Sequence, residues 1–195
     1  MTSNDQIIIN QVISGNTNAF AILVDRYKDL VFTLALRMMK HREEAEEVSQ
    51  DTFIKAFKSL DKFKGDSKFS TWIYKVAYNS CLDKIKSNKR KYNEVEINNH
   101  TTNYIKTTNN AFDDLVEEER KQAIQECLDQ LPSDDSFLLT LFYFEEQSLE
   151  EISSIIGLTP NHVKVKLFRA RKKLASILKE RIEPELIEYY EKEHK

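Results

Sequence analysis

The chain has 195 residues, of which 41% are hydrophobic and only three are Gly and three Pro, so it has material for two small cores and favours a mostly helical fold. Its 29 Lys and Arg stand against 32 Asp and Glu, a net charge of −3, so a strongly basic segment is a local feature rather than the background. No cationic region precedes Ile7–Ile9, and the apolar run Phe137–Phe144 is far too short to cross a bilayer, so we expect no secretion signal, no membrane insertion and a cytoplasmic protein.

Two long helices are predicted in the N-terminal half. Apolar residues recur at helical spacing over Phe20–Lys40, and after a break at His41 a second helix is predicted over Glu43–Leu60. The residues of the second helix that are expected to face inward are Val48, Phe53, Ala56, Phe57 and Leu60. Its outer face carries Glu47, Gln50, Asp51 and Ile54. Acidic side chains around an exposed isoleucine suit a protein interface, with a soluble helix face as the alternative.

A polar loop and a third helix follow. The loop Asp61–Phe69 holds Gly65, one of the three glycines, and the next helix begins at Ser70. That helix ends in a dense basic run, namely Lys84, Lys86, Lys89, Arg90 and Lys91. So many cations on one helix end predict a surface that contacts phosphates.

A segment rich in Asn and Thr, residues 93–112, separates the two halves. It has little apolar surface to bury, which predicts a flexible linker. Such a linker would reach roughly 70 Å when extended, or about 25 Å as a flexible coil. The predicted organisation is therefore an N-terminal domain at 1–92, this linker, a C-terminal domain at 113–179 and a tail at 180–195.

The C-terminal domain contains a predicted helix-turn-helix. Ser148 and Glu151 have the spacing of a capping box, Gly157 supplies a helix stop, and Pro160 suits the first position of a new helix. The segment Thr159–Leu178 is wholly basic in its charges, which are Lys164, Lys166, Arg169, Arg171, Lys172 and Lys173. A basic helix directly after such a turn is the arrangement that enters the major groove of DNA.

The two faces of this basic helix differ. One narrow arc, expected to face the core, holds Val163, Leu167, Ala170 and Leu174. The opposite arc and its flank hold the predicted DNA-reading residues, Asn161, Lys164, Val165, Phe168, Arg169 and Lys172. A solvated basic face would explain the cations but not Phe168 and Val165. DNA explains both, because phosphates bind cations while thymine methyl groups and base edges accept apolar contacts.

An ordered series of motifs resembles the extracytoplasmic-function (group IV) sigma factors of the sigma-70 family. Leu128–Pro132, Phe142–Glu145 and Phe168–Arg171 resemble their promoter-binding C-terminal domain, and Ala45–Phe53 resembles their polymerase-binding segment. The resemblance extends over about Ile7–Lys179. It implies an all-α fold of two small helical domains joined by a flexible linker, the C-terminal one a helix-turn-helix.

The resemblance also implies the partners. The chain would be the specificity subunit of core RNA polymerase, without a catalytic site, cofactor or metal. Its second helix would dock on the β′ clamp helices through the outer face named above, and its C-terminal domain would dock on the β flap. An anti-sigma factor is a further partner that the resemblance allows. The chain is then expected to be an alternative sigma factor that responds to a stress or envelope signal.

The promoter contacts are expected on two surfaces. The face of the basic helix would read the minus-35 element. The loop and the third helix would read the minus-10 element, where a base is extruded as the duplex opens. The residues expected at the minus-10 element are Lys64, Ser67, Lys68, Trp72, Lys75, Asn79 and Lys86. For Trp72, packing in the core is an equally good interpretation, because an aromatic residue at helical spacing usually faces inward.

Two other functional classes fit the sequence less well. A helix-turn-helix repressor or activator would need a dimer surface and a palindromic site, and it would leave the second basic patch and the acidic helix unexplained. An enzyme is supported by no nucleophile–base pair, no Gly-rich phosphate loop and no metal-ligand spacing. The four histidines are scattered, and Cys81 and Cys127 lack CxxC spacing, so we expect reduced thiols and no metal site.

Overall fold

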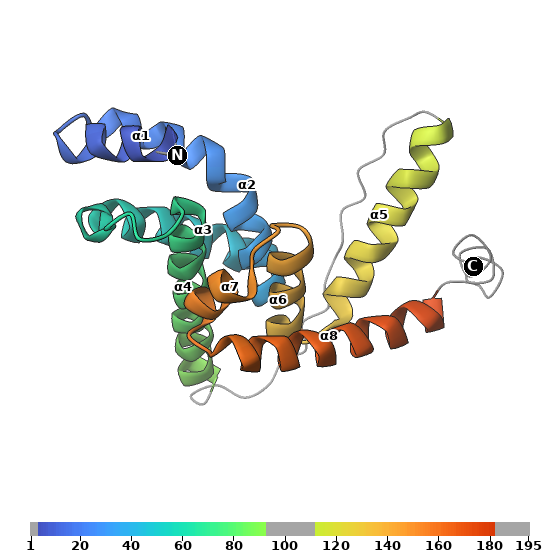
Figure 1. Ribbon diagram of the computed structural model, residues 1–195. Helices are drawn as coiled ribbons and strands as arrows, with labels where there is room; N and C mark the ends of the chain where they lie inside the picture. The colour runs from blue at the N-terminus through green and yellow to red at the C-terminus, as the bar shows by residue number, and fades with distance from the viewer. Residues whose placement is uncertain (1–3, 93–111, 182–195) are drawn as a thin grey trace.

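The computed structural model describes residues 4–92 and 112–181 (Figure 1). The secondary structure of these described residues consists of helices and 3₁₀ turns, without a strand. The N-terminal helices are α1 (Asn4–Ile13), α2 (Phe20–Met39), α3 (Arg42–Lys58) and α4 (Phe69–Tyr92), with 3₁₀ turns η1 (Thr17–Ala19) and η2 (Leu60–Lys62). The C-terminal helices are α5 (Phe112–Gln130), α6 (Ser133–Tyr143), α7 (Leu149–Ile156) and α8 (Pro160–Arg181). The predicted linker and tail lie outside the described residues, apart from Phe112 and residues 180–181.

The predicted helix boundaries in the N-terminal half agree with α2, α3 and α4 to within two residues. The break between α2 and α3 has a clear backbone cause. Lys40 adopts a left-handed conformation at φ 59°, and its N–H donates to the carbonyl of Leu36 at 2.9 Å. This left-handed residue ends α2 and lets α3 fold back along it.

Helix α1 has no counterpart among the sequence predictions. Its inner side buries Ile8, Ile9 and Val12. The buried carboxylate of Asp5 accepts a hydrogen bond from the hydroxyl of Tyr27 at 2.7 Å and pairs with Arg26 of α2. Burial and this bond raise the pKa of Tyr27 above its ordinary range, so the phenol stays a donor. The apolar contacts and the Asp5 pair together fasten α1 to α2.

The helix-turn-helix forms as predicted. The Ser148 hydroxyl accepts from the Glu151 N–H at 3.1 Å, and the Glu151 carboxylate accepts from the Ser148 N–H at 2.8 Å, which completes the capping box. Gly157 ends α7 in a left-handed conformation at φ 70°. After the turn, the Thr159 hydroxyl accepts from the His162 N–H at 3.4 Å at the start of α8.

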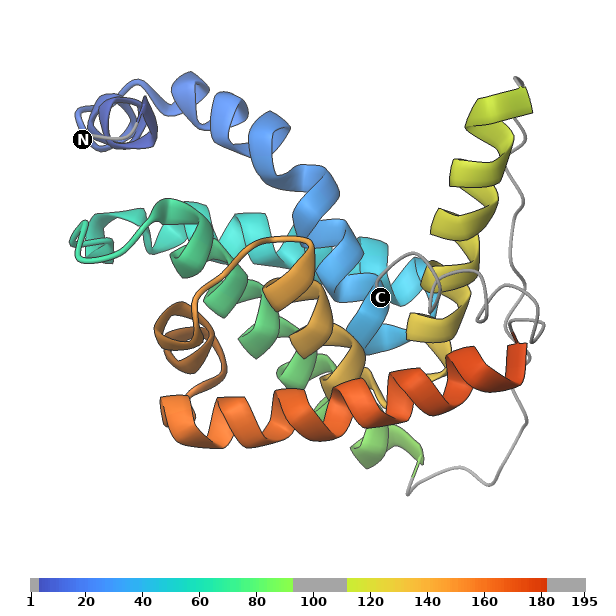
Figure 2. The same ribbon diagram turned by 45° about the vertical axis from the view of Figure 1, so that its right-hand side comes forward.

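The N-terminal and C-terminal helices pack directly against each other. Helices α6 and α7 lie on α2 and α4, and α8 crosses beyond them, whereas the N-terminal end of α5 projects away from the rest (Figures 1 and 2). Buried side chains from both halves, from Ile9 and Leu34 to Leu141 and Leu167, belong to one connected apolar cluster. The two cores that the composition allows are therefore continuous in this structure.

Candidate nucleic-acid and protein interfaces

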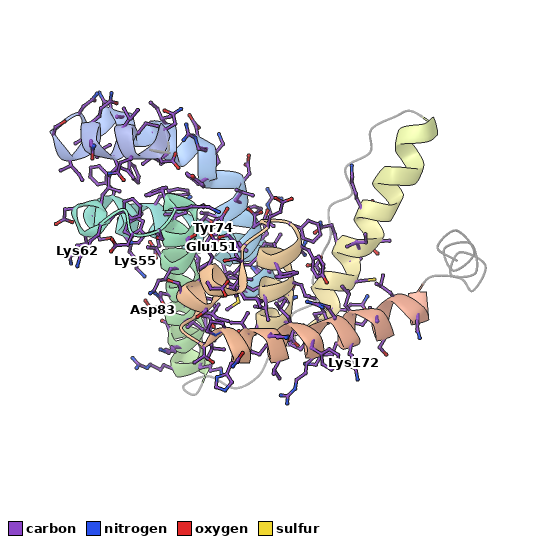
Figure 3. The ribbon with its side chains drawn as sticks, viewed as in Figure 1. Lys55, Lys62, Tyr74, Asp83, Glu151 and Lys172 are labelled. Atoms are coloured by element: carbon purple, nitrogen blue, oxygen red, sulfur yellow. The ribbon has the colours of Figure 1, made fainter. Side chains whose placement is uncertain are left out.

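The inner and outer faces of α8 are those that the sequence predicts. Val163, Leu167 and Ala170 are completely buried. The six residues predicted to read DNA are all exposed, namely Asn161, Lys164, Val165, Phe168, Arg169 and Lys172. Phe168 is 55% exposed and Val165 is 46% exposed, so both apolar side chains face outward among the cations. The Lys172 ammonium lies 4.8 Å from the centre of the Phe168 ring, on the outer side of α8 (Figure 3).

Three further basic residues of α8, Lys166, Arg171 and Lys173, contact other side chains of the protein. Lys173 pairs with Asp135 at 2.6 Å, and Lys166 pairs with Asp134 at 3.6 Å, so both hold α8 to the first turn of α6. The Arg171 guanidinium lies over the rings of Phe142 and Tyr143, at 5.5 and 5.7 Å from their centres. Lys166, Arg171 and Lys173 therefore help to hold α8 in place, whereas Lys164, Arg169 and Lys172 face solvent.

The residues predicted for the minus-10 element lie along one side of α4 and in the loop before it. Lys75, Asn79 and Lys86 are exposed and share a stripe of α4, since their spacings are close to whole helical turns. Lys64 and Ser67 are exposed in the loop. The loop thus stands at the end of a stripe that carries cations and an amide.

Lys68 and Trp72 are already engaged within the molecule. The Lys68 ammonium pairs with the Glu151 carboxylate at 2.9 Å. The Trp72 ring packs against Phe63 and Phe69, with centroid distances of 5.5 Å to each, and remains partly exposed. The Trp72 ring is therefore packed on two core aromatic rings, and its contact with the promoter stays a prediction.

The loop itself rests against α1. Gly65 has a φ of 76°, a conformation that residues with a Cβ rarely adopt. A Cβ at this position would lie 3.3 Å from the side-chain oxygen of Gln6. Helix α1, which the sequence analysis did not predict, thus forms one wall of the loop.

The acidic face of α3 is exposed as predicted, and it is more apolar than predicted. Glu47, Gln50, Asp51 and Ile54 are all exposed. The expectation that Phe57 faces inward is wrong, since its side chain is 42% exposed beside Ile54, which is 52% exposed. Ile54 and Phe57 are spaced i, i+3 and so share one face of the helix, and this spacing could have predicted the exposure of Phe57. The Phe57 ring meets the Phe20 ring edge to face, with their centroids 5.1 Å apart, which explains how it is held at the surface.

Charge pairs connect this face to the basic end of α4. Lys84 pairs with Glu47, and the Asn88 amide donates to the Glu44 carboxylate at 2.7 Å. The pair between Lys55 and Asp83, at 3.3 Å, lies further along the same two helices (Figure 3). The charges of Lys84 and Glu47 are therefore partly neutralised by each other in the free protein.

No helix in the described ranges is long and apolar enough to cross a membrane. Among residues 4–92 and 112–181, no cluster of three His, Cys, Asp or Glu side chains could hold a metal ion. Cys81 and Cys127 are buried and form no disulfide bond, and burial raises the pKa of Cys81 to about 12.

Comparison with known proteins finds two family models in order along the chain. Residues 23–91 match the family model for sigma-70 region 2, and residues 121–174 match that for sigma-70 region 4. The ECF RNA polymerase sigma factor SigW of Bacillus subtilis is 34% identical over 88% of this chain and 95% of its own length. The ECF RNA polymerase sigma-E factor of Escherichia coli K12 is 31% identical over 86% and 90%.

Two solved structures share the fold. RpoE of Bartonella quintana, in complex with the anti-sigma factor NepR, has a TM-score of 0.69 at 20% identity, covering 82% of this chain and 96% of that one. CnrH, in complex with the cytosolic domain of CnrY, has a TM-score of 0.60 at 24% identity, covering 91% and 99%. With both family models in order along one chain and a relative of such identity over nearly its whole length, this protein belongs to the extracytoplasmic-function sigma factors of the sigma-70 family.

Proposed function

We propose that this sigma factor performs its task with three separate surfaces. As a member of its family, it binds core RNA polymerase and directs promoter recognition and transcription initiation. The outer face of α8 reads the minus-35 element, the α4 stripe with its preceding loop reads and opens the minus-10 element, and the outer face of α3 docks on the polymerase. Nothing in this division requires a catalytic residue or a cofactor in the chain itself.

The observation that carries the minus-35 assignment is the outward position of Phe168 and Val165. Exposing two large apolar side chains to water is unfavourable in free energy. A surface that bound phosphates by charge alone would not need these side chains. In a major groove they would contact base edges and thymine methyl groups, while Arg169 and Lys164 reach base acceptors and phosphates. Lys172, over the Phe168 ring, supports that ring and adds a further cation.

The minus-10 assignment follows from the stripe on α4. Lys75 and Lys86 are placed for backbone phosphates, and Asn79 between them can donate to and accept from a base. The partly exposed Trp72 ring offers a stacking surface next to the loop. Stacking and phosphate contacts of this kind offset the few kcal/mol lost when a base leaves the duplex.

The polymerase assignment follows from Ile54 and Phe57 among acidic residues on α3. An apolar centre ringed by Glu47, Gln50 and Asp51 fits a partner helix with its own apolar residues and basic rim. The β′ clamp helices are the proposed partner for this face, and the β flap for the C-terminal domain. We place the protein in the cytoplasm, where polymerase and promoter DNA are found.

Regulation by an anti-sigma factor is part of the proposal. RpoE is solved with the anti-sigma factor NepR, and CnrH with the cytosolic domain of CnrY, and both share this fold. The chain would then be an alternative sigma factor that is released in response to a stress or envelope signal.

Transcription by purified components tests the site assignments. Full-length protein with core polymerase should give discrete transcripts from promoters mapped after induced expression. Replacing Gln50 and Asp51 by alanine should weaken core binding without changing the helical content. The matched control is Asp25→Ala in α2, an exposed acidic residue outside the three assigned surfaces, which should leave core binding unchanged. A protein that instead footprints a palindrome alone and yields no specific transcript with core would be a repressor or activator.

A further inference from the structure

Helix α1 belongs to the N-terminal half, but neither family model covers it. The match to sigma-70 region 2 begins at residue 23, whereas α1 ends at Ile13. Helix α1 nevertheless contacts η2, and it lies beside the connection between α3 and α4 in both ribbon views (Figures 1 and 2). That connection contains the loop for which the minus-10 function is proposed above. A helix outside the matched region therefore borders a proposed promoter contact.

The orientation of α1 about its own axis is fixed by its contacts with α2. The buried Asp5 carboxylate accepts a hydrogen bond from the Tyr27 hydroxyl at 2.7 Å and pairs with the Arg26 guanidinium. One turn further along α1, Ile9 is completely buried. A buried carboxylate without partners is unfavourable, so a rotation of α1 would lose these bonds without replacing them. Because Gln6 directly follows Asp5, the same contacts determine where the Gln6 side chain lies.

The Gln6 side chain lies against the backbone of the loop at Gly65. Its Nε2 donates to the Oδ1 of Asn10, one turn further along α1, at 3.1 Å, which orients the Gln6 amide. A Cβ at Gly65 would lie 3.3 Å from the Oε1 of this amide. Gly65 also has a φ of 76°, in the left-handed region that glycine tolerates. The loop therefore approaches α1 so closely that a side chain at residue 65 would have to displace Gln6.

The two ends of the loop are held in an aromatic cluster. The rings of Phe63, which precedes residues 64–68, and of Phe69, which follows them, meet edge to face with centroids 5.6 Å apart. The Trp72 ring lies 5.5 Å from each of these two rings. The Tyr27 ring packs on Phe69 at 5.4 Å, and its hydroxyl is the one that donates to the buried carboxylate of α1. Helix α1 is thus connected to the ends of the loop as well as to its middle.

We propose that α1 holds the middle of this loop in place and that Gln6 is a positioning residue for promoter opening. The proposal rests on the minus-10 function proposed above for the loop. With its ends in the aromatic cluster and Gly65 against Gln6, the loop needs little rearrangement to receive an extruded base. A loop that had to be ordered on binding would lose conformational entropy at that step. Gln6 acts through the loop backbone and is assigned no contact with DNA.

The first test compares two promoter templates, using the full-length protein bound to core polymerase. One template is fully double-stranded, and the other has a minus-10 element that is already unpaired. Gln6→Ala should lower opening of the double-stranded promoter by about fivefold, the effect of leaving roughly one loop residue to be ordered. Permanganate reactivity of unpaired thymines measures this opening. On the unpaired template, transcription by the variant should equal that by the wild type, because the base has already left the duplex.

The matched control is Gln11→Ala, which removes an exposed amide from another side of the same helix. It should change neither template. Gln6 is itself partly exposed, so its truncation should leave the fold and core binding intact. Unchanged opening of the double-stranded promoter by Gln6→Ala would overturn the positioning role. Equal losses on the two templates would overturn it as well, because they would reflect a general loss of structure.

A double-mutant cycle tests the contact between Gln6 and Gly65. Gly65→Ala strains a left-handed backbone and adds a Cβ 3.3 Å from the Gln6 Oε1, so it should lower promoter opening. When Gln6→Ala is already present, the Cβ has room and only the backbone strain remains. The loss caused by Gly65→Ala should therefore be about threefold smaller in that background. Losses that are equal in the two backgrounds would overturn a role of Gln6 through the loop backbone.

Gly15→Ala is the matched control for this cycle. Gly15 has a φ of 110°, and no atom lies within 4 Å of where its Cβ would stand. Its replacement should therefore have the same effect whether residue 6 is Gln or Ala. A dependence on Gln6 as large as that of Gly65→Ala would mean that the coupling is a general property of α1, which would overturn the specific contact.

A variant of the loop itself separates this inference from the proposed function. Lys64→Ala combined with Ser67→Ala removes two exposed loop side chains assigned to the minus-10 element, and it should impair opening of the double-stranded promoter. If this variant opens the promoter as well as the wild type does, the minus-10 function of the loop is wrong, and the positioning role with it. If this variant is impaired and Gln6→Ala is not, only the positioning role is wrong.

Discussion

Two adjacent residues of α8, Leu167 and Phe168, lie on opposite faces of the helix. Leu167 is completely buried and Phe168 is 55% exposed, although they are neighbours in sequence and similar in hydrophobicity. The first contributes to stability through burial, and the second is available for a partner. Substitutions at these two positions should therefore separate folding from DNA recognition.

We expect Phe168→Ala to weaken binding of the minus-35 element by about 1–3 kcal/mol, because it removes an apolar base contact, and to leave the free energy of unfolding nearly unchanged. The matched change Leu167→Ala should instead cost about 2–5 kcal/mol of stability, because it opens a cavity in the core. Quantitative footprinting and denaturant unfolding measure the two effects. Unchanged footprints with Phe168→Ala would remove this residue from the reading face.

At the scale of elements, the helix-turn-helix depends on two local devices. The capping box of Ser148 and Glu151 begins α7, and the left-handed Gly157 ends it. Both are short-range interactions, so residues within a few positions of each other set where α7 begins and ends.

Gly157→Ala should lower the stability of the protein by about 1 kcal/mol, because alanine has a Cβ that disfavours φ of 70°. No atom lies within 4 Å of where that Cβ would stand, so the cost comes from the backbone alone. Gly157→Asn is the matched control and should cost less, since asparagine tolerates the left-handed conformation. Thermal unfolding of both variants checks this order, and equal losses would contradict it.

The contribution of Glu151 should depend on pH. Desolvation alone would raise its pKa, but the Ser148 N–H and Lys68 together outweigh it and hold the pKa below the usual value for glutamate. Because the folded pKa is the lower one, this contribution is present above the ordinary glutamate pKa and is lost as the pH falls through the folded value. The stability advantage of the wild type over Glu151→Gln should therefore be complete at pH 7, begin to shrink as the pH falls below about 4.3, and vanish once the pH is below the lowered folded pKa. Denaturant unfolding across this range measures it, and an advantage that grows on acidification would refute the assignment.

At the scale of the whole molecule, residues distant in sequence decide the arrangement. Arg37 and Asp129 are 92 positions apart, and both are largely removed from water. A buried pair of this kind contributes little net stability but makes any arrangement that leaves one partner alone costly. It is therefore a contact that favours the observed packing of α2 against the end of α5.

Asp129→Ala should destabilise the protein by about 3 kcal/mol, because it leaves the buried Arg37 guanidinium without its counter-charge. Asp25→Ala removes the partner of Lys28 in an exposed pair and is the matched control, for which we expect no measurable change. Denaturant unfolding of both variants provides the comparison. Equal stabilities would mean that Arg37 is not held in the interior.

Much of the fold was predictable because helices are local. The spacing of apolar residues located α2, α3 and α4, and the capping residues located α7 and the start of α8. Helix α1 was missed because its short apolar run gains stability only by packing on α2, where Asp5 meets Tyr27. Phe57 was misassigned because its ring is held at the surface by Phe20, a contact that helical periodicity cannot show.

By itself, the sequence determined the all-helical fold, the two faces of α8 and the family, since each depends on residues within a few turns of one another. Only the tertiary structure decided that the two halves share one core, that Lys166 and Lys173 pair with α6, and that Lys68 is held by Glu151. Those contacts join segments brought together by burial, and no local periodicity encodes which partner a charged side chain will meet.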